Sequence, residues 1–138
     1  MTDKVEYLNP ENISPAQGLY SSLTKVRAGD LYFISGQLSV GLDGSVVGKG
    51  DFDAQFDQVF KNLSDVLKAV GCDFNDIAKF TTYLVASQHI EKFMLKRKEL
   101  FPKVFATSDY APNTLLVVDR LVKEDFLLEV EAIARARD

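Results

Sequence analysis

The sequence AQFDQVFKNLSDVLKAV, residues 54–70, contains the clearest periodic pattern in the chain. Its apolar residues recur at spacings of three and four, which predicts an amphipathic helix with one continuous apolar stripe. The stripe comprises Phe56, Val59, Phe60, Leu63, Val66, Leu67 and Val70. Asp51 or Asp53 can cap the start of this helix, and Gly71 suits its end.

Runs rich in β-branched and aromatic residues stand on both sides of this helix and predict strands. We expect strands over residues 5–8, 19–26 and 31–35 before it, and over 77–85, 114–118 and 126–134 after it. A second helix begins near Ser87, and Pro102 lies near its end. Residues 27–30 predict a hairpin turn between the second and third strands.

Five glycines fall within residues 36–50, which predicts a loop with a tight turn at Asp43-Gly44. Glycine at this density either lets the backbone approach a ligand closely or only turns the chain. The sequence does not decide between these two roles.

The predicted order of elements is β, β, β, α, β, α, β, β. Each helix joins two strands by a crossover, and hairpins occupy both ends of the chain. This order predicts an α+β fold in a single domain over residues 1–138, with a mixed sheet and two helices packed on one face.

The last strand indicates what covers the other face of the sheet. Phe126, Leu128, Val130, Ala132 and Ala134 share the side that meets the helices, whereas Leu127, Glu129, Glu131, Ile133 and Arg135 share the opposite side. A solvated face does not favour Leu and Ile, and a dry core does not favour two carboxylates. Burial against another subunit, with a polar pocket left open, accounts for both. The alternative is a half-exposed sheet with scattered apolar residues.

Charge and composition exclude several kinds of function. Sixteen Lys and Arg stand against twenty Asp and Glu, a net charge of −4, so we expect no nucleic-acid partner. One His and one Cys exclude a zinc site built from these residues and a disulfide within one chain. The first ten residues have no apolar core of a signal peptide, and no stretch reaches the length of a membrane span. We therefore expect a cytoplasmic protein without a membrane partner.

Few side chains remain as candidates for chemistry. Glu129 and Glu131 can position water or move a proton if they face an enclosed pocket, or they can be structural carboxylates. His89 is expected to be exposed at the start of the second helix. Cys72 is expected to be a small buried residue. The basic run Lys92, Lys96, Arg97 and Lys98 is typical of a solvated helix face, with an RNA-binding patch as the alternative.

Five short strings, in order and at suitable spacing, resemble the RidA (YjgF) family of reactive-intermediate deaminases. They are GLYS at residues 18–21, LYFISGQ at 31–37, the helix at 58–71, DIAKFTTYL at 76–84 and LEVEAIA at 128–134. The resemblance extends from about Ala16 to Arg135.

The resemblance implies a chorismate-mutase-like α+β fold, a homotrimer, and small-molecule pockets between subunits. It also implies hydrolysis of enamines and imines to 2-oxo acids and ammonia, with no cofactor and no metal. Tyr20, Ser35, Gly36 and Gln37 match pocket-lining positions of the family. Glu129 matches the carboxylate that positions the attacking water.

Asn113 departs from the family pattern. Members active on imino acids have Pro-Ala-Arg-Ser/Thr where this chain has Ala111-Pro112-Asn113-Thr114, so Asn113 and Thr114 become the candidate substrate-binding residues. An amide supplies no positive charge and no bidentate fork, which lowers the affinity for a carboxylate about five- to thirty-fold. We expect either a deaminase or related hydrolase with non-standard substrate recognition, or a non-catalytic trimer that binds or senses a metabolite.

Overall fold

The computed structural model describes residues 4–138; residues 1–3, part of the segment in which no signal peptide is expected, lie outside the described residues. β1 (Val5–Leu8) and β2 (Leu23–Val26) form a two-stranded antiparallel sheet. A four-stranded sheet in the order β3-β6-β4-β5 contains β3 (Leu31–Gln37), β4 (Ile77–Leu84), β5 (Asn113–Val117) and β6 (Leu128–Arg135). The two long helices are α1 (Phe52–Ala69) and α2 (Ile90–Val104), and short 3-10 turns cover Phe74–Asp76 and Ser87–His89.

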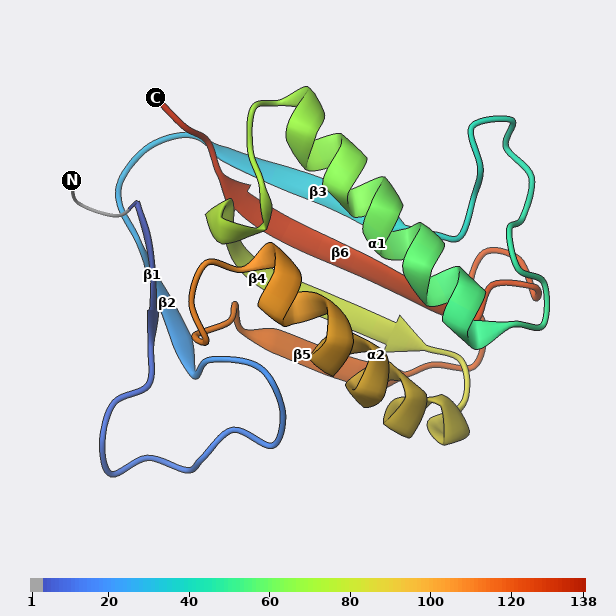
Figure 1. Cartoon of the computed structure of the whole chain (residues 1–138), viewed down its shortest axis with the longest axis horizontal. Helices are drawn as coiled ribbons and strands as arrows, with labels where there is room; N and C mark the ends of the chain where they lie inside the picture. Colours follow the sequence, from blue (N-terminus) through green and yellow to red (C-terminus); the bar gives the residue numbers. More distant parts are fainter. Residues whose placement is uncertain (1–3) are drawn as a thin grey trace.

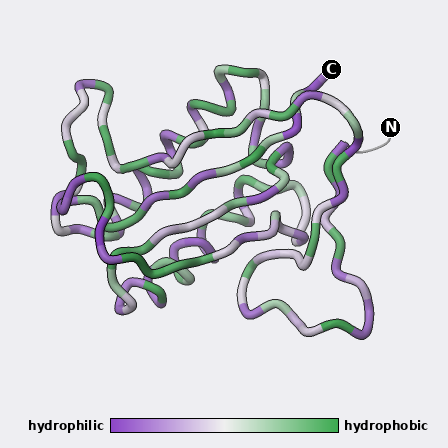
Figure 2. Tube along the Cα trace, turned by 180° about the vertical axis from the view of Figure 1, so that it is seen from behind, coloured by the Kyte–Doolittle hydropathy of each residue, from purple (hydrophilic) through white to green (hydrophobic). Residues whose placement is uncertain are grey.

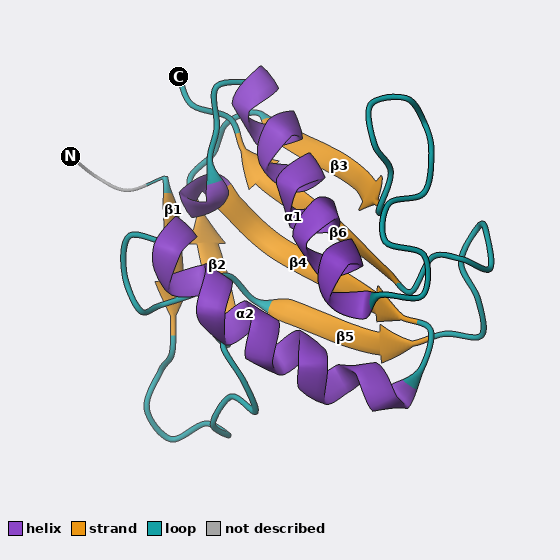
Figure 3. Ribbon diagram, turned by 45° about the vertical axis from the view of Figure 1, so that its right-hand side comes forward, coloured by secondary structure: helices purple, strands orange, loops and turns teal. Residues whose placement is uncertain are grey.

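Both long helices cover the same face of the four-stranded sheet (Figures 1 and 3). β6 runs antiparallel to β3 and β4, whereas β4 and β5 are parallel, so the sheet is mixed. The predicted α+β architecture with two helices on one face is confirmed. Among the residues described, no helix is long and apolar enough to cross a membrane.

Helix α1 begins where the predicted acidic cap stands. The Asp51 side chain accepts a hydrogen bond from Ala54 N at 3.1 Å, and Gly71 follows the helix with a positive φ of 74°. Phe56, Val59, Phe60, Leu63 and Leu67 of the predicted stripe are buried. Val70 is exposed because it already caps the end of the helix.

The predicted hairpins at the two ends of the chain are wrong. β2 pairs with β1, and β3 pairs with β6. Residues 19–22 form no strand, so β2 is shorter than predicted. At the other end, β4 lies between β5 and β6. Local turn residues predict a hairpin only between neighbours in sequence, whereas β6 gains pairing on both of its edges by entering the middle of the sheet.

Arg135 lies on the predicted side of β6, away from the helices, but its side chain is only 3% exposed. Its Nε donates to Arg27 O at 2.9 Å and its Nη2 donates to Ala28 O at 2.7 Å. Gly29, between these carbonyls and Asp30, has a φ of 157°, and a Cβ there would lie 2.2 Å from the Arg135 guanidinium carbon. The segment that was expected to form a hairpin turn therefore wraps the Arg135 side chain.

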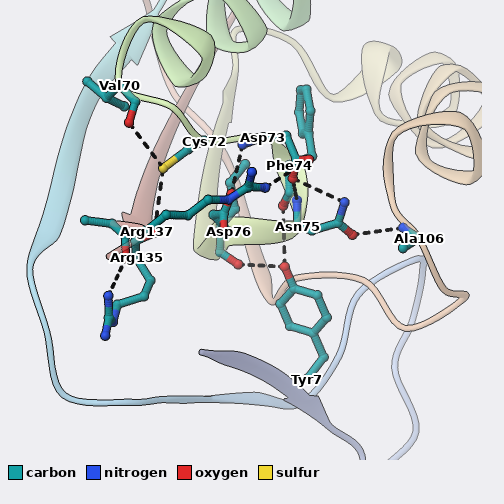
Figure 4. A network of polar contacts seen from close by, with 12 residues as sticks. Tyr7, Val70, Cys72, Asp73, Phe74, Asn75, Asp76, Ala106, Arg135 and Arg137 are labelled. Atoms are coloured by element: carbon teal, nitrogen blue, oxygen red, sulfur yellow. Dashed lines mark hydrogen bonds and ion pairs between the residues drawn. The ribbon is translucent and has the colours of Figure 1, made fainter. Parts of the chain in front are cut away.

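A polar network ties β1 and the C-terminus to the start of β4 (Figure 4). Tyr7 Oη donates to Ile77 O at 2.7 Å, and Arg137 pairs with Asp76 at 2.8 Å. Cys72 is buried beside Arg135 O, as its apolar surroundings predicted, and burial raises the pKa of its thiol. The thiol is therefore a packing group and a poor nucleophile.

Candidate functional site

Glu129 lies on the face of the sheet that the helices do not cover. A Cβ added at Gly36 would lie 1.8 Å from Glu129 Oε2 and 2.5 Å from its Cδ, so the carboxylate packs directly on the glycine backbone. The β3–β6 register is irregular between Ile34 and Gln37, which brings this backbone beside β6. Gly36 therefore lies against Glu129, and Ser35 and Gln37 are its neighbours on β3.

The electrostatics of Glu129 are those of a carboxylate that holds its proton more tightly than usual. Burial raises the pKa of Glu129, and the neighbouring charge of Glu131 raises it further. Glu131 accepts a hydrogen bond from the hydroxyl of Tyr83, which lies directly opposite Glu129 in the β4–β6 register. That bond raises the pKa of Tyr83. Tyr83 was not predicted, although the period of two along β4 places it on this face.

Exposed apolar side chains lie on the same face of the sheet as Glu129. Phe33 is 75% exposed, and Leu31 and Leu116 are also exposed on this face. Figure 2 views the molecule from behind, where no helix covers the sheet. Exposed apolar residues on a sheet face are typical of a surface that binds a ligand or another protein.

A second group of predicted residues lines a cavity of about 420 Å³ between β2 and the start of β5. These residues are Tyr20, Asn113 and Thr114. Thr82 Oγ1 donates to Asn113 Oδ1 at 2.8 Å, and the Asn113 NH₂ group donates to no other group in residues 4–138. Lys79 also lines the cavity. The structure thus brings three of the predicted binding residues together around a mostly apolar hollow with a neutral amide donor.

Within one chain, the residues around Glu129 and the residues around Asn113 do not form one site. Asn113 pairs with Phe80 and Glu129 with Tyr83, so the residues are two strands and three residues apart, roughly 14 Å. Asn113 also points to the helix side with Thr82, whereas Glu129 points to the uncovered side. A small metabolite cannot touch both residues of one chain.

His89 and Arg97 do not lie where the sequence placed them. His89 was predicted to be exposed, but its half-buried ring stacks on Phe52 with centroids 4.8 Å apart. Burial lowers the pKa of His89, and Lys92 lowers it further. Arg97, assigned to a solvated basic face, is only 2% exposed. The missed signal is its spacing of four from both Phe93 and Phe101, which puts all three on the buried side of α2.

Among residues 4–138, no group of three or more His, Cys, Asp or Glu side chains could hold a metal ion. The groups placed around the candidate site are carboxylates, amides, hydroxyls, the ammonium of Lys79 and backbone. Such groups perform proton transfer and hydrogen bonding to small polar molecules.

The fold and site define a class of small α+β proteins with a carboxylate held on an uncovered sheet face. A family model described as Endoribonuclease L-PSP matches residues 11–136. The chain belongs to this family, in which relatives are named RutC, Rid and YjgF proteins.

Two curated relatives illustrate the family. A RutC family protein from Pyrococcus horikoshii is 34% identical over 129 residues, covering 94% of this chain and 96% of the relative. Reactive Intermediate Deaminase A of Arabidopsis thaliana, a chloroplast protein, is 29% identical and matches 95% of this chain and 66% of its own length.

Solved structures agree with the fold. The Rid protein YyfB from Yersinia pestis superimposes with a TM-score of 0.85 at 26% identity, covering 96% of this chain and 99% of that chain. TdcF from E. coli, solved with bound serine, gives a TM-score of 0.70 at 27% identity and the same coverage.

Proposed function

We propose that this chain forms a homotrimer and hydrolyses a small enamine or imine in sites shared between neighbouring copies. One copy supplies Glu129 with Ser35, Gly36 and Gln37, and the next supplies Tyr20, Asn113 and Thr114. The exposed apolar side chains on the face of Glu129 and the roughly 14 Å between Glu129 and Asn113 of one chain support this arrangement. A relative named as a reactive intermediate deaminase and a small molecule bound to TdcF support the activity.

In the proposed reaction Glu129 acts as general base and then as general acid. It takes a proton from water while the water oxygen bonds to the imine carbon. That proton goes to the nitrogen and gives a carbinolamine. Glu129 then moves the hydroxyl proton of the carbinolamine to the nitrogen as the C–N bond breaks and the carbonyl forms, so that ammonia and an oxo compound leave. A raised pKa suits both steps, because a group that titrates closer to neutral pH can accept a proton and return it.

The single observation that carries the proposal is the position of the Glu129 carboxylate against the bare backbone of Gly36. Only a glycine leaves room for the carboxylate there, and the backbone beside it can hold a water or a substrate. Beside it, Tyr83 holds Glu131 and so keeps a second acceptor in place.

The direct test is ammonia release from freshly generated 2-iminobutanoate. We expect activity in the native chain and a loss of about 10²-fold or more in Glu129→Gln, since a positioned acid–base group contributes about 10²–10⁴-fold. Glu99→Gln is the matched control, because Glu99 is exposed on α2. Equal rates in Glu129→Gln and Glu99→Gln would contradict the proposal.

Mixed trimers test whether the site is shared. Asn113→Asp is nearly isosteric and repels an anionic substrate, so both it and Glu129→Gln should be inactive alone. When the two variants are refolded together in equal amounts, a heterologous ring of three regenerates intact sites at about a quarter of its interfaces. Activity near a quarter of native supports sharing, and no recovery assigns the whole site to one chain.

The second candidate is a trimer that binds a metabolite without turnover. Asn113 favours it, because the cavity has an amide donor where a charged fork would hold a carboxylate more tightly. A thermal-shift screen followed by recovery of the compound decides: a ligand that binds and returns unaltered, with no ammonia from 2-iminobutanoate, favours binding alone.

A further inference from the structure

The guanidinium of Arg97 is buried and without a charged partner. Arg97 is 2% exposed, and its Nε and Nη1 have no hydrogen-bond partner in the part of the chain that the structure describes. Its Nη2 meets only the Met94 sulfur, at 3.0 Å, and a thioether is a weak acceptor. No ion pair within residues 4–138 includes Arg97.

Aromatic rings stabilise this charge only in part. The Arg97 guanidinium carbon lies 5.2 Å from the centre of the Phe93 ring and 5.8 Å from that of Phe101. Such contacts recover only part of the hydration that an unpaired ion loses inside a protein. Burial accordingly lowers the pKa of Arg97 to about 10. No acidic side chain of residues 4–138 balances the Arg97 charge.

The cover over Arg97 is thin and adjoins a residue that lines the cavity. A Cβ on Gly18 would lie 2.5 Å from Arg97 Nη2, so only bare backbone covers the guanidinium there. Gly18 O accepts a hydrogen bond from Tyr20 N at 3.0 Å, and Tyr20 lines the cavity of about 420 Å³. Tyr20 is also the titratable group that acts on the Arg97 charge.

Asn113 lies on the side of the sheet that α2 covers. It lines the cavity and points to the helix side of β5, over which α2 passes (Figures 1 and 3). Its NH₂ group is free to donate within the described residues. A carboxylate entering past the Gly18–Tyr20 turn would meet a guanidinium from α2 and an amide from β5.

We propose that Arg97 is the anchor for the carboxylate of a small ligand, held between α2, the Gly18–Tyr20 turn and Asn113. Where the ligand is the substrate of the proposed hydrolysis, this proposal rests on the proposed function. The guanidinium on α2 then supplies the positive charge that Asn113 lacks.

Binding of 2-oxobutanoate, measured by calorimetry at constant chloride and ionic strength, tests the anchor without turnover. Uncharged 2-butanone is the matched ligand. We expect the native chain to bind 2-oxobutanoate and not 2-butanone. Arg97→Met should weaken binding about 10- to 150-fold, the range of a hydrogen bond to a charged partner. The affinity of Arg97→Lys should lie between those of the native chain and Arg97→Met, because Lys keeps the positive charge and loses the bidentate fork of the guanidinium.

Lys79 supplies the rival cation, since it is exposed and lines the same cavity. Lys79→Met should bind within twofold of native. If Lys79→Met loses binding and Arg97→Met keeps it, the anchor is Lys79 and the proposal is overturned. Absence of binding by the native chain, or equal binding of 2-butanone, overturns it as well.

Folding and function are separated by two further readouts. Arg97→Met should unfold at the same or higher urea concentration than the native chain, because it removes an unpaired buried charge and keeps the volume filled. If the native chain binds 2-oxobutanoate but releases no ammonia from 2-iminobutanoate, the role of Arg97 as anchor stands and the proposed hydrolase activity is refuted. Ammonia release with an unchanged KM in Arg97→Met refutes the anchor and leaves the hydrolase intact.

Discussion

The contact between Gly36 and Glu129 can be broken by one methyl group. Gly36 has no positive φ, so Ala fits its backbone, and the change acts only through the added Cβ. That Cβ would lie 1.8 Å from Glu129 Oε2, whereas real Cβ contacts are not shorter than 3.0 Å. The carboxylate must therefore withdraw by at least 1.2 Å, the difference between these distances. A misplacement of about 1 Å costs about 10²-fold in rate, or about 2.7 kcal/mol of transition-state stabilisation.

The fold should tolerate this change. The atoms that the methyl group meets are the far end of the flexible Glu129 side chain, so they can move without shifting backbone. Ala at a compatible position also stabilises a protein by about 0.4–1 kcal/mol through the unfolded chain. We expect the urea midpoint of Gly36→Ala to stay near that of the native chain while ammonia release from 2-iminobutanoate falls about 10²-fold.

Gly41→Ala is the matched control, because the shortest contact of its Cβ would be 3.2 Å, to the carboxylate of the exposed Asp43. It should keep the native rate. A Gly36→Ala chain that retains the native rate, in a protein that Glu129→Gln inactivates, would show that the carboxylate does not work from its place on Gly36.

Three further changes test the energetics. The pKa of Glu129 is raised in the folded chain, so the protonated carboxyl stabilises the fold fully at a pH below its pKa in the unfolded chain. This stabilisation is lost as the pH rises through the pKa of the folded chain. Glu129→Gln should therefore gain stability relative to the native chain between pH 4 and pH 7 in urea melts. Tyr7→Phe removes the bond to Ile77 O at 2.7 Å and should lower the free energy of unfolding by about 0.5–1.5 kcal/mol, whereas Tyr32→Phe, with no such bond, should not. Gln55→Ala leaves three backbone groups without the buried amide and should cost about 2–4 kcal/mol by urea unfolding; a cost under about 1 kcal/mol would mean that water replaces the amide.

The sequence determined the elements better than their pairing. Periodicity reports how a segment buries one face, so α1 and the inward side of β6 were predicted correctly. Pairing depends on partners far along the chain, and the turn-like residues 27–30 indicated a hairpin that does not form. Arg135, on the strand that enters the middle of the sheet, occupies the carbonyls of that turn.

The candidate site was predictable by position, and its direction was predictable only in part. The period of two along the last strand already predicts Glu129 on the side away from the helices. For Asn113 the family strings give the position alone, and the β4–β5 register assigns its side chain to the helix side with Thr82. Arg97 was hidden among basic neighbours, although its spacing from two phenylalanines carried the signal.

Assembly and chemistry are coupled in the proposed trimer through the surroundings of Glu129. Phe33 is 75% exposed, and its burial against a second copy would stabilise the assembly by about 1.5–3 kcal/mol. Assembly over this face of the sheet would also remove water from Glu129 and raise its pKa further. By linkage, protonation of Glu129 would then strengthen association, so the native chain should assemble more tightly as the pH falls from neutral, and Glu129→Gln should lose this dependence. A neutral amide at position 129 cannot respond to pH, and so the variant separates the proposed catalytic carboxylate from the apolar residues proposed for the interface.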